Sequence, residues 1–403
     1  MKRIVILLIG VFMFAGLNAQ NSKVVSAYNY LRNGQLDKAK EAIDAASVHV
    51  KTKDAAKTWF YRGNIYLAIQ VSEEEKYNNL DPNALMEAYD SYQKAISIDN
   101  KVINTNLRPS TPMQGLYFCG DQFYNVGVKL YNNKKYAEAT ESFVNAVKSN
   151  NIFGKTDSLA MFNAALCAEL AEKPEIAKKY YIQLLNLNYT KPTIYTSLAG
   201  IYKSEDNSEK EIEIIEKGRK TFPDDFNLII AETNYHLSAG NSEKALELLN
   251  IAIEQDPENQ TLYFAIGSNY NSIVDDTAKS VEERANGFIK AEKSYIKAIE
   301  IDSAYFDPIY NLGALYFNEG IKIFELADAI SDFELYAVEK EKYDAMWAKA
   351  FPYLERALEI DGENLNTLIS LKQLYARTNQ PEKLQKVNEK LKEVQGQLEL
   401  IDD

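Results

Sequence analysis

Residues 226–259 read FNLIIAETNYHLSAGNSEKALELLNIAIEQDPEN and carry the pattern from which the fold can be predicted. Ala245 and Ala252 stand seven residues apart in this stretch, and Pro257 follows shortly after them. Small side chains at helical spacing predict that neighbouring helices touch at those points. The same alanine spacing recurs along the chain on a grid of about 34 residues, which predicts stacked antiparallel helix pairs. The other pairs are Ala39/Ala46, Ala88/Ala95, Ala139/Ala146, Ala291/Ala298 and Ala350/Ala357.

Four consecutive units continue this register without interruption, and they are expected to start at Ser158, Pro192, Phe226 and Gln260. Their order of small and large residues resembles the tetratricopeptide repeat (TPR) family. In that family, small residues at repeat positions 8, 20 and 27 let helices approach, and large residues at 4, 11 and 24 fill the gaps. The resemblance implies an all-α, TPR-like α-solenoid of about nine helix-pair repeats forming a right-handed superhelix.

The predicted organisation has four parts after an N-terminal signal over residues 1–19. Three insertions fall between the two helices of a repeat, and their amphipathic composition predicts extended helices rather than loops. The irregular linker over residues 99–112 is interpreted as a candidate hinge, because it contains Arg-Pro and Thr-Pro. The parts are two TPR-like repeats over 20–98, the second with an insertion, an irregular linker over 99–112, a central array over 113–303, and C-terminal repeats with long inserted helices and a polar cap over 304–403.

The first residues, MKRIVILLIGVFMFAGLNA, have the layout of a secretory signal: a basic start, an apolar run and a small residue at the end. We expect cleavage between Ala19 and Gln20, with an uncleaved anchor as the alternative. No cysteine near that point could accept a lipid, and Cys119 and Cys167 are interpreted as buried free thiols rather than a disulfide. The expected location is periplasmic or secreted, with no transmembrane segment in the mature chain.

Charge and composition argue against several functions. The formal net charge of −13 at pH 7 opposes contact with phosphate backbones, so we expect no nucleic-acid partner. The only histidines are His49 and His236, and no phosphate-binding glycine loop, nucleophile elbow or zinc-protease signature occurs. The sequence therefore predicts a protein that is not an enzyme and that uses no cofactor or metal.

The TPR resemblance also implies where a partner would bind, since first-helix positions 2, 5, 9, 12 and 13 line the concave groove of that family. Aromatic side chains there offer rigid contact area, and asparagines can pair with the backbone of an extended peptide. The alternative is that the aromatics pack between neighbouring first helices. The candidate groove contacts are Phe60, Asn64, Tyr124, Tyr131, Phe162, Asn234, Phe264, Tyr310 and Phe317.

These features together predict a non-enzymatic scaffold that is exported and binds a protein or an extended peptide in its groove. It resembles the exported TPR-array proteins of Gram-negative bacteria. The alternative is a SusD-like glycan- or nutrient-binding helper at the cell envelope, although that class usually carries a lipoprotein cysteine and a large non-repeat domain. The carboxylate clamp of some TPR proteins is not supported, because Arg32, Lys57, Lys203 and Arg377 are scattered. Partner identity and oligomeric state do not follow from these patterns.

Overall fold

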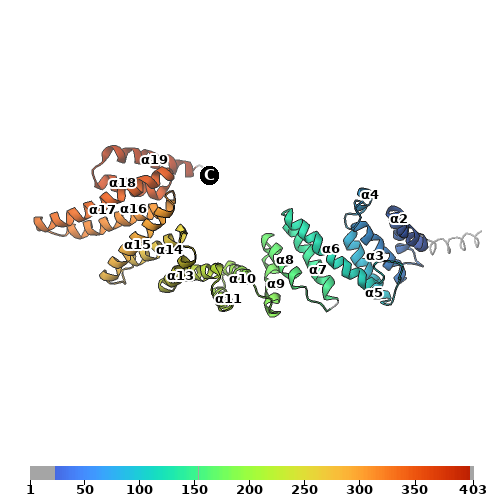
Figure 1. The fold of residues 1–403 in the computed structure, drawn as a ribbon. Coiled ribbons are helices and arrows are strands. Elements are labelled where there is room, and N and C mark those ends of the chain that lie inside the picture. Colours follow the sequence, from blue (N-terminus) through green and yellow to red (C-terminus); the bar gives the residue numbers. More distant parts are fainter. Residues whose placement is uncertain (1–22, 153, 400–403) are drawn as a thin grey trace, which may run out of the picture. The chain divides into compact units, whose positions relative to one another are not determined.

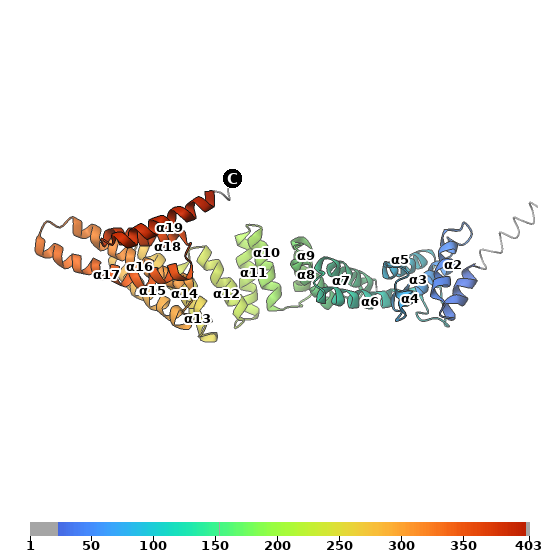
Figure 2. The same cartoon turned by 90° about the horizontal axis from the view of Figure 1, so that it is seen from above.

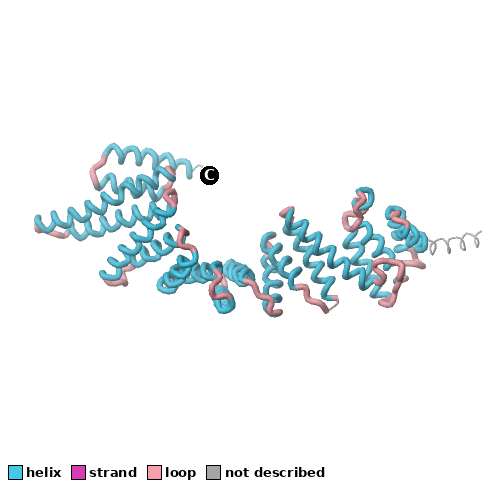
Figure 3. Tube along the Cα trace, viewed as in Figure 1, coloured by secondary structure: helices cyan, strands magenta, loops and turns pink. Residues whose placement is uncertain are grey.

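The structure is a computed structural model that describes residues 23–152 and 154–399 (Figure 1). The predicted signal over residues 1–19 lies outside the described residues. Within the described ranges every regular element is a helix, and turns or loops connect the helices (Figure 3). None of these helices is long and apolar enough to cross a lipid bilayer. The chain divides into two compact units, one up to Lys191 and one from Pro192 onward.

Unit 1 consists of helices that follow one another as neighbours along the chain. Residues 23–32 are helical and precede the first labelled helix. The remaining helices are α2 (Leu36–Val48), α3 (Ala56–Gln70), α4 (Glu75–Asn78), α5 (Ala84–Ile98), α6 (Pro112–Asn132), α7 (Tyr136–Asn151), α8 (Ser158–Leu170) and α9 (Pro174–Asn186).

Unit 2 has the same arrangement of sequential helix pairs. Its last six helices share one apolar core. The helices are α10 (Pro192–Ser204), α11 (Ser208–Thr221), α12 (Phe226–Ser238), α13 (Ser242–Gln255), α14 (Gln260–Asp275), α15 (Val281–Ile301), α16 (Phe306–Asp328), α17 (Phe333–Ile360), α18 (Leu365–Arg377) and α19 (Pro381–Glu399).

The predicted repeat register is confirmed. Helices α8, α10, α12 and α14 begin at the four residues expected to open the consecutive units. Local chemistry explains these starts, because an Asx side chain caps three of them. Asp157 accepts from the Ala160 backbone N–H, Asp225 from that of Leu228, and Asn259 from that of Thr261. The fourth start has proline as its first helical residue, where the missing N–H is harmless.

The steric explanation of the alanine pattern is also confirmed. Every alanine of the seven-residue pairs is fully buried, including Ala245 and Ala252. Glycines take the equivalent role in the first helices. A Cβ built at Gly63 would lie 2.5 Å from the Tyr92 ring, so only glycine lets α3 and α5 pack this closely.

Two of the three insertions form extended helices, as expected. One lengthens α15 to 21 residues, and another produces α16 and α17, with 23 and 28 residues. The first insertion is different, and the prediction of an extended helix is wrong there. Residues between α3 and α5 form turns around the short helix α4, with Tyr77 buried. The stretch Asn78–Pro82 explains the difference, because asparagines and Asp-Pro favour turns.

The predicted irregular linker is non-helical up to Thr111, and Pro112 begins α6. It is attached to the preceding repeat rather than free. The Asn104 side chain donates a hydrogen bond of 3.1 Å to the Tyr61 hydroxyl, and Leu107 is buried. The two compact units divide between Lys191 and Pro192, within the stretch predicted as one central array.

Candidate binding surfaces

Three of the predicted groove residues are buried, which corrects their assignment as partner contacts. Phe60 has no exposed surface and packs beside the Tyr92 ring, at 6.4 Å between ring centroids. The Asn64 amide oxygen accepts a hydrogen bond of 2.8 Å from the Tyr92 hydroxyl. Phe317 is also buried, in the core of unit 2. For these three, the alternative of packing between helices is the one that the structure supports, because a covered side chain cannot touch a ligand.

Tyr124 and Phe162 are partly exposed on successive first helices of unit 1, α6 and α8. The Tyr124 ring lies against Phe143, and the Asn163 amide donates a hydrogen bond of 3.0 Å to its hydroxyl. The Phe162 ring lies beside those of Tyr181 and Tyr189, and the Lys191 ammonium is 4.3 Å from its centroid. Each aromatic side chain is thus held in place while part of its surface remains accessible.

Unit 2 repeats this arrangement on its own first helices. Phe264 of α14 is partly exposed, and its ring is 5.6 Å from that of Tyr305. Tyr310 of α16 stacks on Phe306 at 5.9 Å, with the two rings nearly parallel. Helices α14 and α16 contact each other, so the two aromatic groups belong to one packed face.

The last two predicted contacts lie at the surface. Tyr131, near the end of α6, is exposed, and its ring is 5.7 Å from that of Tyr136. Asn234 of α12 is exposed as well. Among the described residues, neither belongs to a hydrogen-bonded cluster that would orient it. The first-helix surface is therefore best defined by Tyr124 and Phe162 in unit 1, and by Phe264 and Tyr310 in unit 2.

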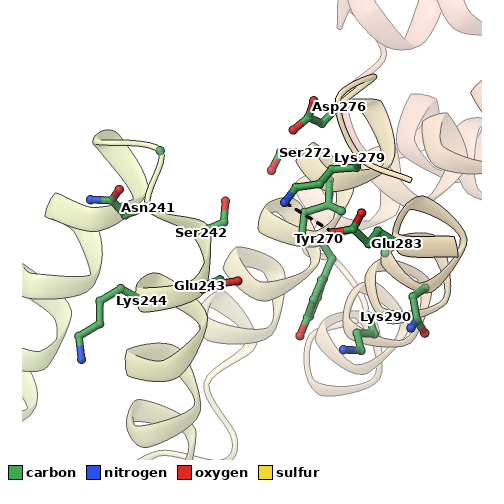
Figure 4. Close-up of a pocket in the computed structure, with 14 residues that line it drawn as sticks. Asn241, Ser242, Glu243, Lys244, Tyr270, Ser272, Asp276, Lys279, Glu283 and Lys290 are labelled. Carbon is green, nitrogen blue, oxygen red and sulfur yellow. Dashed lines mark ion pairs between the residues drawn. The ribbon is translucent and has the colours of Figure 1, made fainter. Parts of the chain in front are cut away.

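A polar hollow in unit 2 was not predicted from the sequence. It has a volume of about 730 Å³ and opens between the start of α13 and the first turns of α15 (Figure 4). Tyr270 lies between the two sides, with the Lys290 ammonium 5.0 Å from its ring centroid. Lys279 and Glu283 form an ion pair of 3.7 Å at the rim. A hydrogen bond from the Ser280 backbone N–H holds the pKa of the Glu283 carboxyl below its usual range.

A second hollow of about 650 Å³ adjoins the first, since Tyr270 and Lys290 line both. Its lining is more apolar and includes Ile253 of α13 and Ile289 and Ile296 of α15. We call the two hollows together the α13–α15 groove. The insertion that lengthens α15 was visible in the sequence. Its position beside α13 depends on packing between repeats, which no local pattern reports.

The groups available for chemistry are few in the described part of the chain. No set of three or more His, Cys, Asp or Glu side chains there could hold a metal ion. Cys119 and Cys167 are free and buried, which confirms the prediction. Burial raises the pKa of the Cys119 thiol to about 12 and that of Cys167 to about 11. Both are therefore protonated at neutral pH and are poor nucleophiles.

By its own register and helix contacts, the chain is a TPR-type array of antiparallel helix pairs. No protein-family model matches it, and no curated protein matches it. Solved structures with a similar fold include TPR proteins. The C-terminal part of a TPR repeat-containing protein from Cytophaga hutchinsonii is 14% identical, covers 66% of this chain and 93% of its own, and has a TM-score of 0.49.

Two further structures cover similar shares of the chain. A TPR repeats protein from Bacteroides fragilis is 23% identical, over 64% of this chain and 98% of its own, with a TM-score of 0.27. YrrB, described as a TPR protein with an unusual peptide-binding site, is 15% identical, over 56% of this chain and 98% of its own, with a TM-score of 0.39. Identities this low concern the fold alone, and they assign no role to any residue here.

Proposed function

We propose that the protein is a non-enzymatic scaffold that binds proteins or extended peptides with the first-helix faces of its two units. The observation that carries this proposal is the pair of partly exposed aromatic residues on successive first helices in each unit. These are Tyr124 and Phe162 in unit 1, and Phe264 and Tyr310 in unit 2. Rings already held by neighbouring rings lose little conformational freedom when a ligand covers them, which favours binding.

The chemistry of these faces favours a ligand with apolar or aromatic side chains. In unit 1 the Lys191 ammonium beside Phe162 adds a positive charge, and the Tyr124 hydroxyl adds a hydrogen-bonding group. An extended segment that combines an apolar side chain with a nearby carboxylate or backbone carbonyl would satisfy both. In unit 2 the corresponding surface is mainly aromatic.

The proposed location is the periplasm or the outside of the cell, and it is supported by the N-terminal sequence over residues 1–19. The alternative of a SusD-like glycan- or nutrient-binding helper would use the same exposed rings in a different way, by stacking on sugars. A glycan array therefore separates the two functions. Glycan binding that disappears with Phe162→Ala and Phe264→Ala would favour the alternative.

Site-specific photocrosslinking in intact cells tests the scaffold function directly. A photoreactive phenylalanine would replace Phe264 or Tyr310, and in a matched control it would replace Glu213, which is exposed on the second helix α11 of the same unit. Mass spectrometry then identifies the crosslinked proteins. We expect the same partner from both first-helix positions and none of it from Glu213. Crosslinks at Glu213 alone, or no shared partner at the first-helix positions, would contradict the proposed function.

A further inference from the structure

The hairpin of α16 and α17 ends in an exposed apolar tip. The two helices run side by side to a short connection at the edge of unit 2 (Figures 1 and 2). Nearer the base they are well packed, with Trp347 buried against Gly320. At the far end Phe333 is 83% exposed and Leu326 is 73% exposed. Large apolar side chains this exposed and this close in the chain are typical of an interaction surface.

The same tip is strongly acidic. Glu325, Asp328, Asp332 and Glu334 all lie between residues 325 and 335, and no lysine or arginine does. Asp332 is occupied in capping α17, where it accepts from two backbone N–H groups. Within the described chain the other three carboxylates form no ion pair. An apolar tip with free negative charges fits an apolar groove with free positive charges.

The α13–α15 groove has these properties. Ile253, Ile289 and Ile296 line its apolar part. Lys290 and Lys293 lie on its α15 side, and in the part of the chain that the structure describes neither pairs with a carboxylate.

The acidic groups that line the apolar part of the groove are already engaged. Glu292 accepts a hydrogen bond from the Tyr316 hydroxyl and lies 3.5 Å from the Lys349 ammonium. Glu300 pairs with Lys297. Two positive charges in this part of the groove are therefore left for an incoming ligand.

We propose that the α16–α17 tip of one copy of the protein docks into the α13–α15 groove of a second copy. Phe333 and Leu326 would enter the isoleucine-lined part, while Glu325 and Asp328 would face Lys290 and Lys293. Tip and groove are different surfaces, so the contact is head-to-tail, and each molecule can both donate a tip and accept one. Contacts of this kind produce rings or open chains rather than closed two-fold dimers. This self-association is independent of the first-helix faces.

Charge reversal in sedimentation-velocity experiments tests the proposal. Wild-type protein is expected to associate more as its concentration rises. The tip variant Glu325→Lys/Asp328→Lys and the groove variant Lys290→Glu/Lys293→Glu should each weaken association by about tenfold or more. An equimolar mixture of the two variants should associate again, because each reversed surface then meets an opposite charge. The apolar variant Leu326→Ala/Phe333→Ala should weaken association without changing the charge.

The matched control is Glu213→Lys/Glu216→Lys, which changes the net charge by the same amount as the tip variant but at exposed residues of α11. It should leave association at the wild-type level. Circular dichroism spectra identical to wild type would show that the variants fold. A monomeric wild type at every concentration would overturn the proposal. So would equal weakening by the control, or a mixture of the two charge variants that stays monomeric. Loss of self-association would leave the crosslinking result at Phe264 and Tyr310 unaffected.

Discussion

Gly267 of α14 lies directly against the ring of Tyr295 of α15, and a Cβ at this glycine would come 2.6 Å from two ring carbons. No real Cβ tolerates such a contact, so the missing side chain and the large ring together set the distance between the helices of this repeat. A glycine lies against a ring in the same way at Gly63 and Tyr92 and at Gly127 and Phe143, and Gly313 lies against the aliphatic side chain of Leu354.

The substitution Gly267→Ala should therefore destabilise unit 2 by about 1–3 kcal/mol, because the new methyl group overpacks the contact with Tyr295. Gly200 provides a matched control in α10, since a Cβ there would meet nothing within 4 Å. Gly200→Ala should stabilise the protein by about 0.4–1 kcal/mol, because alanine restricts the unfolded chain more than glycine does. Urea denaturation measures both free energies, and effects of the same sign would contradict the packing relationship.

Helix α13 offers a second test of the repeat register. Ala252 is fully buried, whereas Glu254, two residues later, is exposed. Ala252→Leu should overpack the helix contact and lower the free energy of unfolding by about 1–3 kcal/mol. Glu254→Leu should change it by about 0.5 kcal/mol or less, as is usual for surface positions. Comparable losses at the two sites in thermal or urea denaturation would mean that this helix face is misassigned.

Arg62 joins three helices of unit 1 through charged hydrogen bonds. Its guanidinium lies 3.2 Å from Asp44 of α2 and 2.7 Å from Glu87 of α5. Arg62→Ala leaves both carboxylates without this partner and should cost about 1.5–3 kcal/mol. Lys76→Ala removes an exposed ion pair with Glu74, which water and salt screen, and should change the free energy of unfolding much less than Arg62→Ala does. The prediction fails if denaturation midpoints of the two variants coincide.

The buried thiols predict a loss of stability in alkali. Their folded-state pKa values of about 12 for Cys119 and about 11 for Cys167 lie above that of a free thiol, about 8.5. Above pH 8.5 the unfolded chain releases these protons while the folded chain retains them, so the free energy of unfolding falls as the pH rises. Cys119→Ala/Cys167→Ala should show a shallower decrease between pH 8.5 and 11.

The same two residues allow a simpler measurement. In the folded protein, a thiol reagent at pH 8 should modify neither cysteine, and both should react once the protein is unfolded in guanidinium chloride. Rapid modification of Cys119 without denaturant would show that its surroundings open readily, contrary to its complete burial.

Signal processing can be checked on protein recovered from the cell envelope. N-terminal sequencing or intact mass should show a chain that begins at Gln20, because the small residue Ala19 ends the apolar leader. Retention of Met1 would indicate an uncleaved anchor instead, and a cytoplasmic location would contradict the proposed export.

The sequence predicted the helix register correctly because the signal is local and repeated. A small residue that touches a neighbouring helix, such as Ala252, has the same environment in each repeat, so its spacing is visible without coordinates. The first residue of a helix, such as Phe226, could also be predicted from the sequence, because the preceding Asp225 caps the N-terminus of α12. The α15 extension also followed from amphipathic periodicity.

The candidate groove contacts were predicted less well, and Phe60 and Phe264 show why. Both occupy position 5 of their repeats, yet Phe60 is completely buried and Phe264 is partly exposed. Their burial depends on the neighbouring elements. Around Phe60 these include Tyr61 and Tyr92, whereas Phe264 packs beside Tyr295 and Tyr305. A repeat position therefore indicates which way a side chain points, but not what covers it.

The sequence alone determined the class of fold, the spacing of the helices and the length of two insertions, because each of these depends on contacts that recur within a repeat. Three other properties became visible only in the three-dimensional packing: which aromatic rings remain accessible, the turns that the first insertion forms around α4, and the groove between α13 and α15. Those properties depend on how one repeat covers the next. Coverage between repeats is a relationship between segments that no local pattern of residues encodes.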